Sequence, residues 1–220
     1  MRRDIVTACI AMVVFTVLLG VVYPLVITGV SQVAFPGNAN GQKVYVNGKL
    51  VGSRIIGQSF KKVVLDKNGK PKEEEEEVVT EADPRYFQSR PSATEGGAYN
   101  AAASTFSNRG PNDKATEEAY VENIKAYLEL EKPYDPSLST AQIPVDAVNT
   151  SGSNLDPEIS EANARIQAHR IAAKRGLSLD VVDGLISKYT DSRGLGFSGE
   201  PGVNVLELNL ALDRLTGATG

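Results

Sequence analysis

The sequence predicts an α+β protein in which one N-terminal transmembrane helix is followed by a single exported domain of mixed helices and strands. Three observations support this class. Residues 5–30 carry no charged side chain, which is typical of a membrane span. Asn47-Gly48 lies between two alternating apolar and polar segments, which indicates a β-hairpin. The C-terminal third contains helix start and stop signals around Gly176.

The span at residues 5–30 contains 26 residues, more than the roughly 18–20 that a bilayer core requires. Pro24 lacks an amide hydrogen and crowds the carbonyl of Gly20, so we expect a kink there. Thr16, Gly20 and Pro24 recur every four residues and offer a small-residue face for another membrane helix. We add Tyr23 to this surface as an interfacial aromatic, because the chain has no Trp. A span that only faces lipid is the alternative.

The charges beside the span predict its orientation. Arg2 and Arg3 precede it, and the first charge after it is Lys43. The positive-inside rule therefore places residues 1–4 in the cytoplasm and residues 31–220 outside the cell membrane. A cleaved signal peptide is an alternative, although the apolar run is unusually long for one and no A-x-A site follows it.

Composition restricts the function of the exported part. The chain has 220 residues and a net charge of −4, and because Arg2, Arg3 and Asp4 contribute +1, the exported part carries −5. This charge disfavours nucleic-acid binding. The only cysteine, Cys9, lies in the span, which excludes disulfides and thiolate metal sites outside it. The only histidine, His169, excludes a His-rich metal cluster.

The first half of the exported part contains predicted strands and polar connections. We expect a hairpin over residues 43–58, followed by a solvated polar excursion over residues 63–80. Within this excursion, the acidic run Glu73–Glu77 has a cation-collecting patch as its alternative interpretation. Residues 85–94 are predicted to form a strand that Pro91 ends, with a glycine-rich loop after it.

Helices dominate the second half. We expect one from Thr116 to Leu130 that Lys132-Pro133 closes, followed by a short strand over residues 143–148. A helical hairpin then follows, whose helices begin after Ser160 and Ser178 and are separated by Gly176. Residues 203–215 fit both a helical and a strand period, and we favour a helix that docks on the core.

No catalytic constellation is evident. His169 shares its helix with several basic residues, and no carboxylate stands at helical spacing to orient it. The glycine-rich segment 194–202 lacks the lysine and the preceding strand of a phosphate-binding loop, so we expect a connection built from turns. The polar segment 151–160 could coordinate a hard cation, but its spacing does not match an EF-hand, and turn and cap roles explain its residues.

Several sequence blocks, in order, resemble a known family: GSRIIGQSF, RYFQSRPSAT, YNAAAS, IPVDAVNTSGSNLDPEISEANARIQAHRIA and GEPGVNVLELNLALD. The chain is similar to the C subunit of the Kdp-type potassium-transporting P-type ATPase, the KdpC family, over nearly its whole length. The positions that match the motifs of this family are Gly57, Gln58, Arg90, Pro91, Ser92, Ser153, Asn154, Asp156, Gly199, Glu200 and Pro201.

Two departures from the family pattern stand out. Residues 104–111 read STFSNRGP where the family has SGGSNLGP, which weakens the case for a nucleotide-contacting loop there. Residues 61–83 resemble an insertion between two family blocks.

The resemblance implies a non-catalytic accessory subunit of a high-affinity potassium uptake complex. Its partners would be a channel-like potassium-binding subunit, an ATP-hydrolysing P-type ATPase subunit and a small single-span subunit, in addition to the lipid bilayer. It also implies a catalytic chaperone that raises the ATP affinity of the pump subunit, with ATP as a ligand through the complex. Because ATP is cytoplasmic, an exported domain would act on it through the membrane.

Two other classes of function stay open from the residues alone. One is a stand-alone membrane-anchored hydrolase or binding protein of the cell envelope, and the other is a secreted domain released by cleavage. For the accessory subunit, the acidic exported domain would lie near the ion entrance, where its negative charge raises the local cation concentration.

Overall fold

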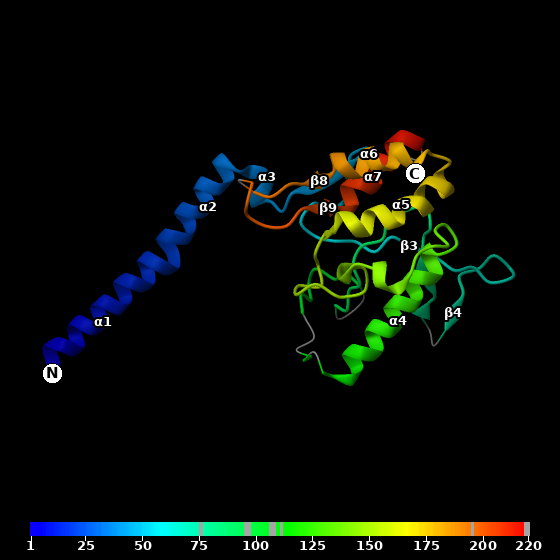
Figure 1. Cartoon of the computed structure of the whole chain (residues 1–220). Helices are drawn as coiled ribbons and strands as arrows, with labels where there is room; N and C mark the ends of the chain where they lie inside the picture. The colour runs from blue at the N-terminus through cyan, green and yellow to red at the C-terminus, as the bar shows by residue number, and fades with distance from the viewer. Residues whose placement is uncertain (75–76, 95–97, 106–108, 111, 195, 218–220) are drawn as a thin grey trace. The chain divides into compact units, whose positions relative to one another are not determined.

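The computed structural model describes residues 1–74, 77–94, 98–105, 109–110, 112–194 and 196–217. The chain forms two compact units, Met1–Ser53 and Arg54–Gly220. An apolar N-terminal helix and a following set of helices and small antiparallel sheets confirm the predicted α+β class (Figure 1).

The N-terminal helix of the first unit is long and apolar enough to cross a membrane. It covers Arg2–Ala34 with a mean hydropathy of 2.8, and none of its residues is buried. It is built from α1 (Arg2–Val17), a π-helical turn η1 (Leu18–Val22) and α2 (Tyr23–Ala34). In η1 the Tyr23 amide donates to the Leu18 carbonyl, five residues back. This π turn directly precedes Pro24, and π turns are a common cause of helix bending, while the kink predicted at Pro24 stays a prediction.

The short helix α3 (Pro36–Ala39) leads into the hairpin β1 (Lys43–Val46) and β2 (Lys49–Ser53). Asn47 has φ 50° and Gly48 has φ 79°, the positive values that a two-residue hairpin turn needs, so the predicted turn is confirmed. Its predicted extent to residue 58 is wrong, because the Gly57 amide bonds the Leu155 carbonyl instead of a hairpin partner. The boundary between the two compact units falls after Ser53. The boundary predicted after residue 30, where the chain would leave the membrane, stays a prediction.

The excursion at residues 63–80, predicted to be a solvated polar segment, contains short paired β-strands. β3 (Lys61–Val63) pairs with β6 (Thr80–Ala82), and β4 (Glu73–Glu74) pairs with β5 (Glu77–Val78). Its described residues are largely exposed, as expected. Glu75 and Glu76 of the acidic run lie outside the described residues. The interpretation of residues 61–83 as an insertion relative to the family stays a prediction.

The predicted strand at residues 85–94 is wrong. The backbone there bonds side chains of two helices instead of a neighbouring strand. The Phe87 amide donates to Asn209 Oδ1 at 2.9 Å, and Asn209 Nδ2 returns a bond to the Phe87 carbonyl at 2.9 Å. Gln167 does the same for Gln88, with distances of 2.7 and 3.1 Å. Because side-chain amides satisfy this backbone, the segment needs no strand partner.

The predicted helix after the glycine-rich loop is confirmed as α4 (Lys114–Glu131), which begins two residues earlier than expected. Asp113 caps it, because its carboxylate accepts from the Ala115 and Thr116 amides. The strand predicted at residues 143–148 is wrong. That segment contains the 3-10 helix η3 (Val145–Ala147), closed by the local bond from the Val148 amide to the Val145 carbonyl, and the similar turn η2 (Thr140–Gln142) precedes it.

The predicted helical hairpin is confirmed as α5 (Glu161–Arg175) and α6 (Leu179–Lys188). Ser160 and Ser178 cap them by accepting from backbone amides, and Gly176 ends α5 at φ 65°. The last segment is a helix, as favoured, and the remaining elements form one three-stranded antiparallel sheet. The helix is α7 (Val205–Thr216). The sheet contains β7 (Glu158–Ile159), β8 (Thr190–Asp191) and β9 (Gly202–Asn204), with β9 in its centre.

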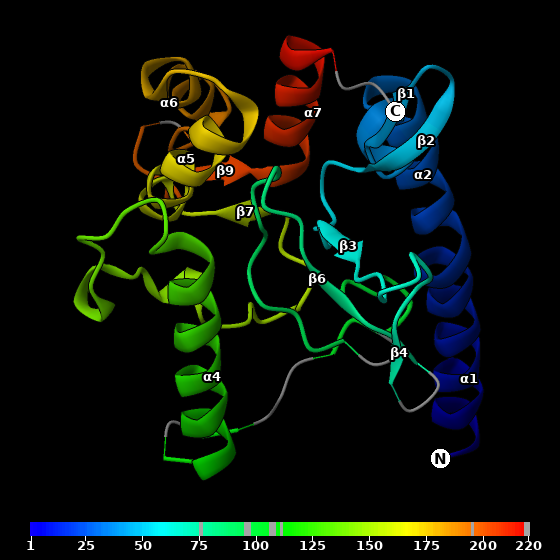
Figure 2. The ribbon, with the colours of Figure 1, turned by 90° about the vertical axis from the view of Figure 1, so that its right-hand side faces the viewer.

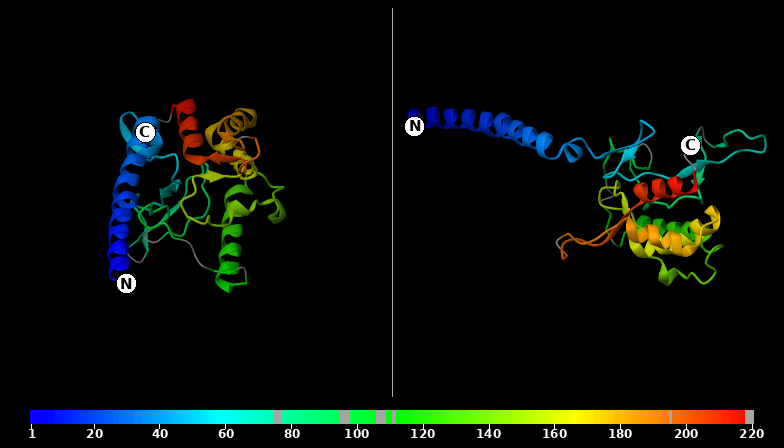
Figure 3. Two further views of the ribbon diagram at one scale, coloured as in Figure 1. Left: turned by 90° about the vertical axis from the view of Figure 1, so that its left-hand side faces the viewer. Right: turned by 90° about the horizontal axis from the view of Figure 1, so that it is seen from above.

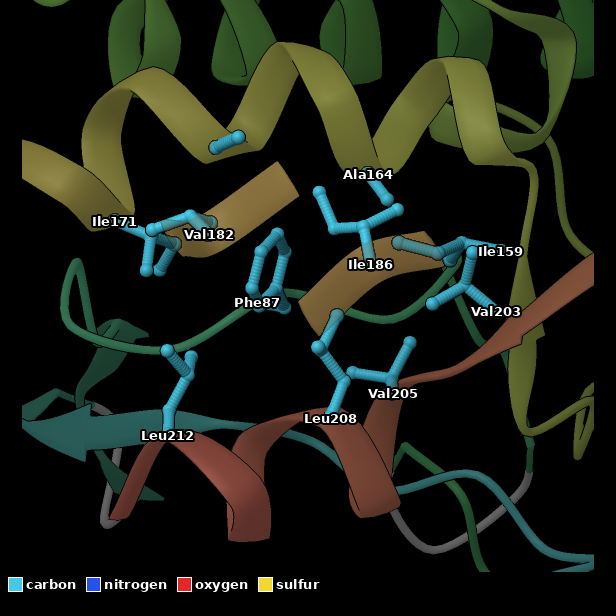
Figure 4. Close-up of a cluster of buried hydrophobic side chains, with 11 residues drawn as sticks. Phe87, Ile159, Ala164, Ile171, Val182, Ile186, Val203, Val205, Leu208 and Leu212 are labelled. Carbon is cyan, nitrogen blue, oxygen red and sulfur yellow. The ribbon is translucent and has the colours of Figure 1, made fainter. Parts of the chain in front are cut away.

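The core of the second unit lies between α5, α6, α7 and β9, with Phe87 among them (Figure 4). Phe87, Ile186 and Leu208 are each completely buried. α4 contacts α5 outside this apolar cluster (Figure 2). Burial of Leu208 and Leu212 confirms that the last helix docks on the core.

A buried ion pair joins α4 to α5. Arg170 Nε donates to both carboxylate oxygens of Glu131, at 3.0 and 3.1 Å, and the side chains are 0% and 1% exposed. The same guanidinium donates to the carbonyls of Pro84 and Tyr86 and to Gln167 Oε1. Burial raises the pKa of Glu131 to about 7, and the adjacent guanidinium opposes this rise.

We expect Arg170→Met to lower the free energy of unfolding by about 3–5 kcal/mol, because Glu131 would remain as a buried carboxylate without its partner. Arg165→Met is the matched control on the same helix. Arg165 is 45% exposed in its ion pairs, and its loss should cost less than about 1 kcal/mol. Urea titration of the detergent-solubilised chain, followed by circular dichroism, measures both. Equal losses would contradict a structural role for the buried pair.

Candidate functional site

Eight of the eleven family-motif positions belong to segments that meet in the second unit. Gly57 and Gln58 follow the hairpin, residues 90–92 lie in the segment predicted as a strand, and residues 153–156 precede β7. We call these eight residues the motif cluster: Gly57, Gln58, Arg90, Pro91, Ser92, Ser153, Asn154 and Asp156.

An ion pair joins two segments of the motif cluster. Arg90 Nη1 donates to Asp156 Oδ2 at 3.0 Å, and Arg90 Nη2 donates to the Thr150 carbonyl at 3.3 Å. The second oxygen of Asp156 accepts from the Glu158 amide at 3.0 Å, at the start of β7. Asp156 thus acts as a turn residue and as the counterion of Arg90. Both of its carboxylate oxygens have hydrogen-bond donors from the protein.

Asn154 and Ser92 provide a second connection. Asn154 is 2% exposed and has φ 58°, and its Oδ1 accepts from the Ala93 amide at 3.2 Å. Ser92 Oγ donates to the Asn154 carbonyl at 2.8 Å and accepts from the Tyr99 amide at 3.0 Å. The Ser153 carbonyl accepts from Ser104 Oγ at 3.3 Å. These bonds position one polypeptide segment against another. The hydroxyls of Ser92 and Ser104 bond backbone groups and are not paired with a catalytic base.

Tyr99 lies in the glycine-rich loop predicted after residues 85–94, and the sequence does not indicate its structural role. Its hydroxyl donates to the Arg90 carbonyl at 2.6 Å, and burial raises its pKa to about 12. Its φ of 62° is rare for an aromatic residue and is not indicated by the sequence.

Gly57 is required where these segments cross. A Cβ atom at this position would lie 2.3 Å from Tyr99 Cε1 and 2.6 Å from the Asp156 carbonyl oxygen. Both distances are far below normal contact, and the second neighbour is backbone, so only glycine fits.

Gly199, Glu200 and Pro201 lie apart from the motif cluster in sequence and in contacts. They belong to the connection between β8 and β9, where Gly199 has φ 84° and Glu200 accepts from Arg193 Nη2 at 2.6 Å. The Gly194 and Ser198 amides bond each other's carbonyls, at 2.7 and 2.8 Å, so they are not free to hold a phosphate. The predicted turn-built connection is confirmed for the described residues of this segment.

A cavity of about 590 Å³ borders the motif cluster. Its wall includes Gln58 and residues 90–92 from the cluster, together with polar side chains of α4 and α5. Arg90 Nε is a buried donor without a hydrogen-bond partner in the described part of the chain. The wall also carries Lys61, Glu81, Glu129, Glu131, Tyr127, Asn123 and Gln167, so its charge is mixed.

The arrangement offers no acid–base pair of the hydrolase type at His169. This residue is exposed on α5, whereas Arg170 beside it points into the core. The neighbouring carboxylate is Asp135, whose pKa is lowered first by the Ser137 hydroxyl and to a smaller extent by His169. Over the described residues, no group of three or more His, Cys, Asp or Glu side chains could hold a metal ion.

The membrane helix carries the other candidate residues. No atom of the first unit would meet a Cβ at Gly20, and Tyr23 is 59% exposed. The π turn lies between Thr16 and Pro24, so it changes the angle at which these two residues project relative to a regular α-helix. Their role in packing against a partner stays a prediction.

We expect Gly57→Ala to lower the free energy of unfolding by about 1–3 kcal/mol, because the added methyl group overlaps the Asp156 carbonyl. Gly152→Ala is the control, since its added Cβ meets no atom within 4 Å. Thermal and urea unfolding of the full chain in detergent compare the two. A Gly57→Ala variant as stable as the control would show that these segments do not cross so closely.

Comparison with known proteins identifies the relatives of this chain. The family model of KdpC, described as K+-transporting ATPase, c chain, matches residues 5–214. A protein of Methylococcus capsulatus is 45% identical over 208 residues, which cover 94% of this chain and 96% of the relative. A protein of Mycobacterium tuberculosis is 45% identical over 216 residues, covering 98% and 100%. One of Koribacter versatilis is 41% identical over 213 residues, covering 97% and 95%. All three are named potassium-transporting ATPase KdpC subunit, and the present chain belongs to the KdpC family.

Proposed function

We propose that this chain is a membrane-anchored, non-catalytic accessory subunit of a potassium-transporting ATPase. The observation that carries the proposal is the 33-residue apolar helix Arg2–Ala34, no residue of which is buried by its own unit. In a complex, such a helix is free to pack against other membrane helices as well as lipid. Family membership supplies the transport function.

The partners follow from the same reasoning. A transport ATPase needs an ion-conducting part and an ATP-hydrolysing part, and the described residues of this chain show one candidate membrane helix and no catalytic group of residues. We infer that it assembles with a channel-like potassium-binding subunit, a P-type ATPase subunit and a small single-span subunit. Thr16, Gly20, Tyr23 and Pro24 form the surface that we assign to helix packing.

The orientation proposed for the chain places the second unit outside the cytoplasm, because Arg2 and Arg3 precede the helix and the positive-inside rule assigns such residues to the cytoplasm. The net charge of −5 on the residues after the span favours cations near that unit. We infer that the second unit lies beside the ion entrance of the complex and stabilises its assembly.

A chaperone effect on ATP is compatible with this topology only through coupling across the membrane. Under the proposed orientation, the cavity beside the motif cluster faces the side that lacks ATP. An increase in the ATP affinity of the pump subunit would then require that this chain favours one state of the complex. The alternative of a stand-alone envelope hydrolase gains no support from the geometry around His169.

Gly20→Leu should weaken assembly, because a bulky side chain prevents close approach of a partner helix. Gly29→Leu is the matched control, since Gly29 also has open space around it but lies five residues beyond Pro24, on a different side of α2. The measurement is recovery of the two large membrane subunits by affinity purification of this chain in mild detergent. Full recovery with Gly20→Leu would contradict the packing surface but not the membrane anchor.

A second test concerns ATP. A complex that contains only residues 1–53 of this chain, the first compact unit, should show a KM for ATP raised by about fivefold or more, if the second unit acts by coupling. The full chain alone in nanodiscs should not bind an ATP analogue. Binding of the analogue to the chain alone, or an unchanged KM in the truncated complex, would contradict the coupled mechanism.

A further inference from the structure

One aromatic side chain of the second unit stands exposed without a structural role. Phe197 is 75% exposed, more than any other large apolar side chain that the structure describes in this unit. It lies in the connection between β8 and β9, which extends away from α5, α6 and α7 (Figure 3). We call the described residues of this connection, 192–194 and 196–201, the Phe197 loop.

The Phe197 loop is ordered by its own backbone. In addition to the paired Gly194 and Ser198 amides, the Phe197 amide donates to the Gly194 carbonyl at 3.2 Å. The Gly196 amide donates to the Arg193 carbonyl at 3.0 Å. These local bonds restrict the described residues on either side of Phe197, which lowers the entropy that they lose when the side chain binds.

The charges of the loop neutralise each other. Arg193 Nη2 donates to Glu200 Oε2 at 2.6 Å, beside the turn that carries Phe197. A paired arginine and glutamate at a surface place little net charge beside the aromatic ring. This arrangement lowers the cost of moving the ring into a less polar environment.

The base of the loop lies where the chain enters the second unit. Asn204 is the last residue of β9, and its Nδ2 donates to the carbonyl of Arg54, the first residue of the unit, at 2.8 Å. Phe197 precedes Asn204 by seven residues, so it can be no more than about 25 Å from that point. The chain therefore tethers the exposed ring within that distance of the residue at which the second unit begins.

We propose that Phe197 inserts into the interface of the lipid bilayer and gives the second unit a reversible membrane contact besides the helix Arg2–Ala34. Burial of one phenylalanine side chain favours the inserted state by about tenfold or more. That weak affinity is sufficient here, because the tether holds the unit near the membrane at an effective concentration of roughly millimolar. The proposal rests on the membrane anchoring in the proposed function.

The absence of tryptophan from the sequence makes a direct test possible. Phe197→Trp places the single tryptophan of the chain in the loop, where it can be excited selectively over the tyrosines. Val145→Trp places one at a comparably exposed position, since Val145 is 71% exposed in η3. Each full-length variant is reconstituted into phosphatidylcholine vesicles with and without brominated acyl chains. Flotation of the vesicles first establishes whether the chain is anchored at all.

Brominated lipid should reduce the emission of Phe197→Trp by about twofold and leave Val145→Trp unchanged, because the bromine atoms quench only a ring at interfacial depth. If neither variant is quenched, or both are quenched equally, the proposal is wrong. Protection of Phe197→Trp from iodide only when the partner subunits are added, without quenching by lipid, would assign the ring to a protein surface and overturn it. A chain that fails to float with the vesicles would contradict the membrane anchor itself.

Discussion

The second unit depends on the buried pair between Arg170 and Glu131. The guanidinium joins the end of α4 to α5 and also holds the carbonyls of Pro84 and Tyr86, so three distant parts of the sequence meet at one charge. A buried arginine cannot lose its proton and cannot be left unpaired at a tolerable cost. The positions of α4, α5 and the segment before Phe87 are therefore coupled. If any one of them packed differently, the buried guanidinium would lose a hydrogen-bond partner, which costs free energy.

Side-chain amides extend the same constraint into the apolar core. Asn209 and Gln167 each bond both the amide and the carbonyl of one residue, which fixes Phe87 and Gln88 without a sheet. Phe87 is thereby placed between α5, α6 and α7, where it is completely buried. In this unit, the buried side-chain amides of Asn209 and Gln167 hold Phe87 in the core, and most of the other core side chains come from the helices.

The motif cluster has a structural logic of the same kind. Three chain segments are held together beside a cavity by the pair between Arg90 and Asp156, the close crossing at Gly57 and the half-buried Tyr99. Hydroxyl, amide and carboxylate groups there bond backbone atoms, as in a scaffold, and do not form a nucleophile and base. Together with an exposed apolar helix in the first unit, this arrangement supports the proposal of an accessory subunit.

Features that depend on local chemistry follow from a few neighbouring residues. The uncharged run before Ser31, the Asn47-Gly48 turn and the helices that begin after Ser160 and Ser178 are all encoded within a few residues. The other features depend on contacts between residues that are far apart in the chain, so they follow only from the tertiary structure. Residues 85–94 have the composition of a strand, yet helix side chains more than 70 residues away take their hydrogen bonds. Similarly, nothing in the sequence around Arg170 distinguishes it from Arg165 on the same helix. Arg165 is exposed, whereas Arg170 becomes a buried charge because α4 packs against it.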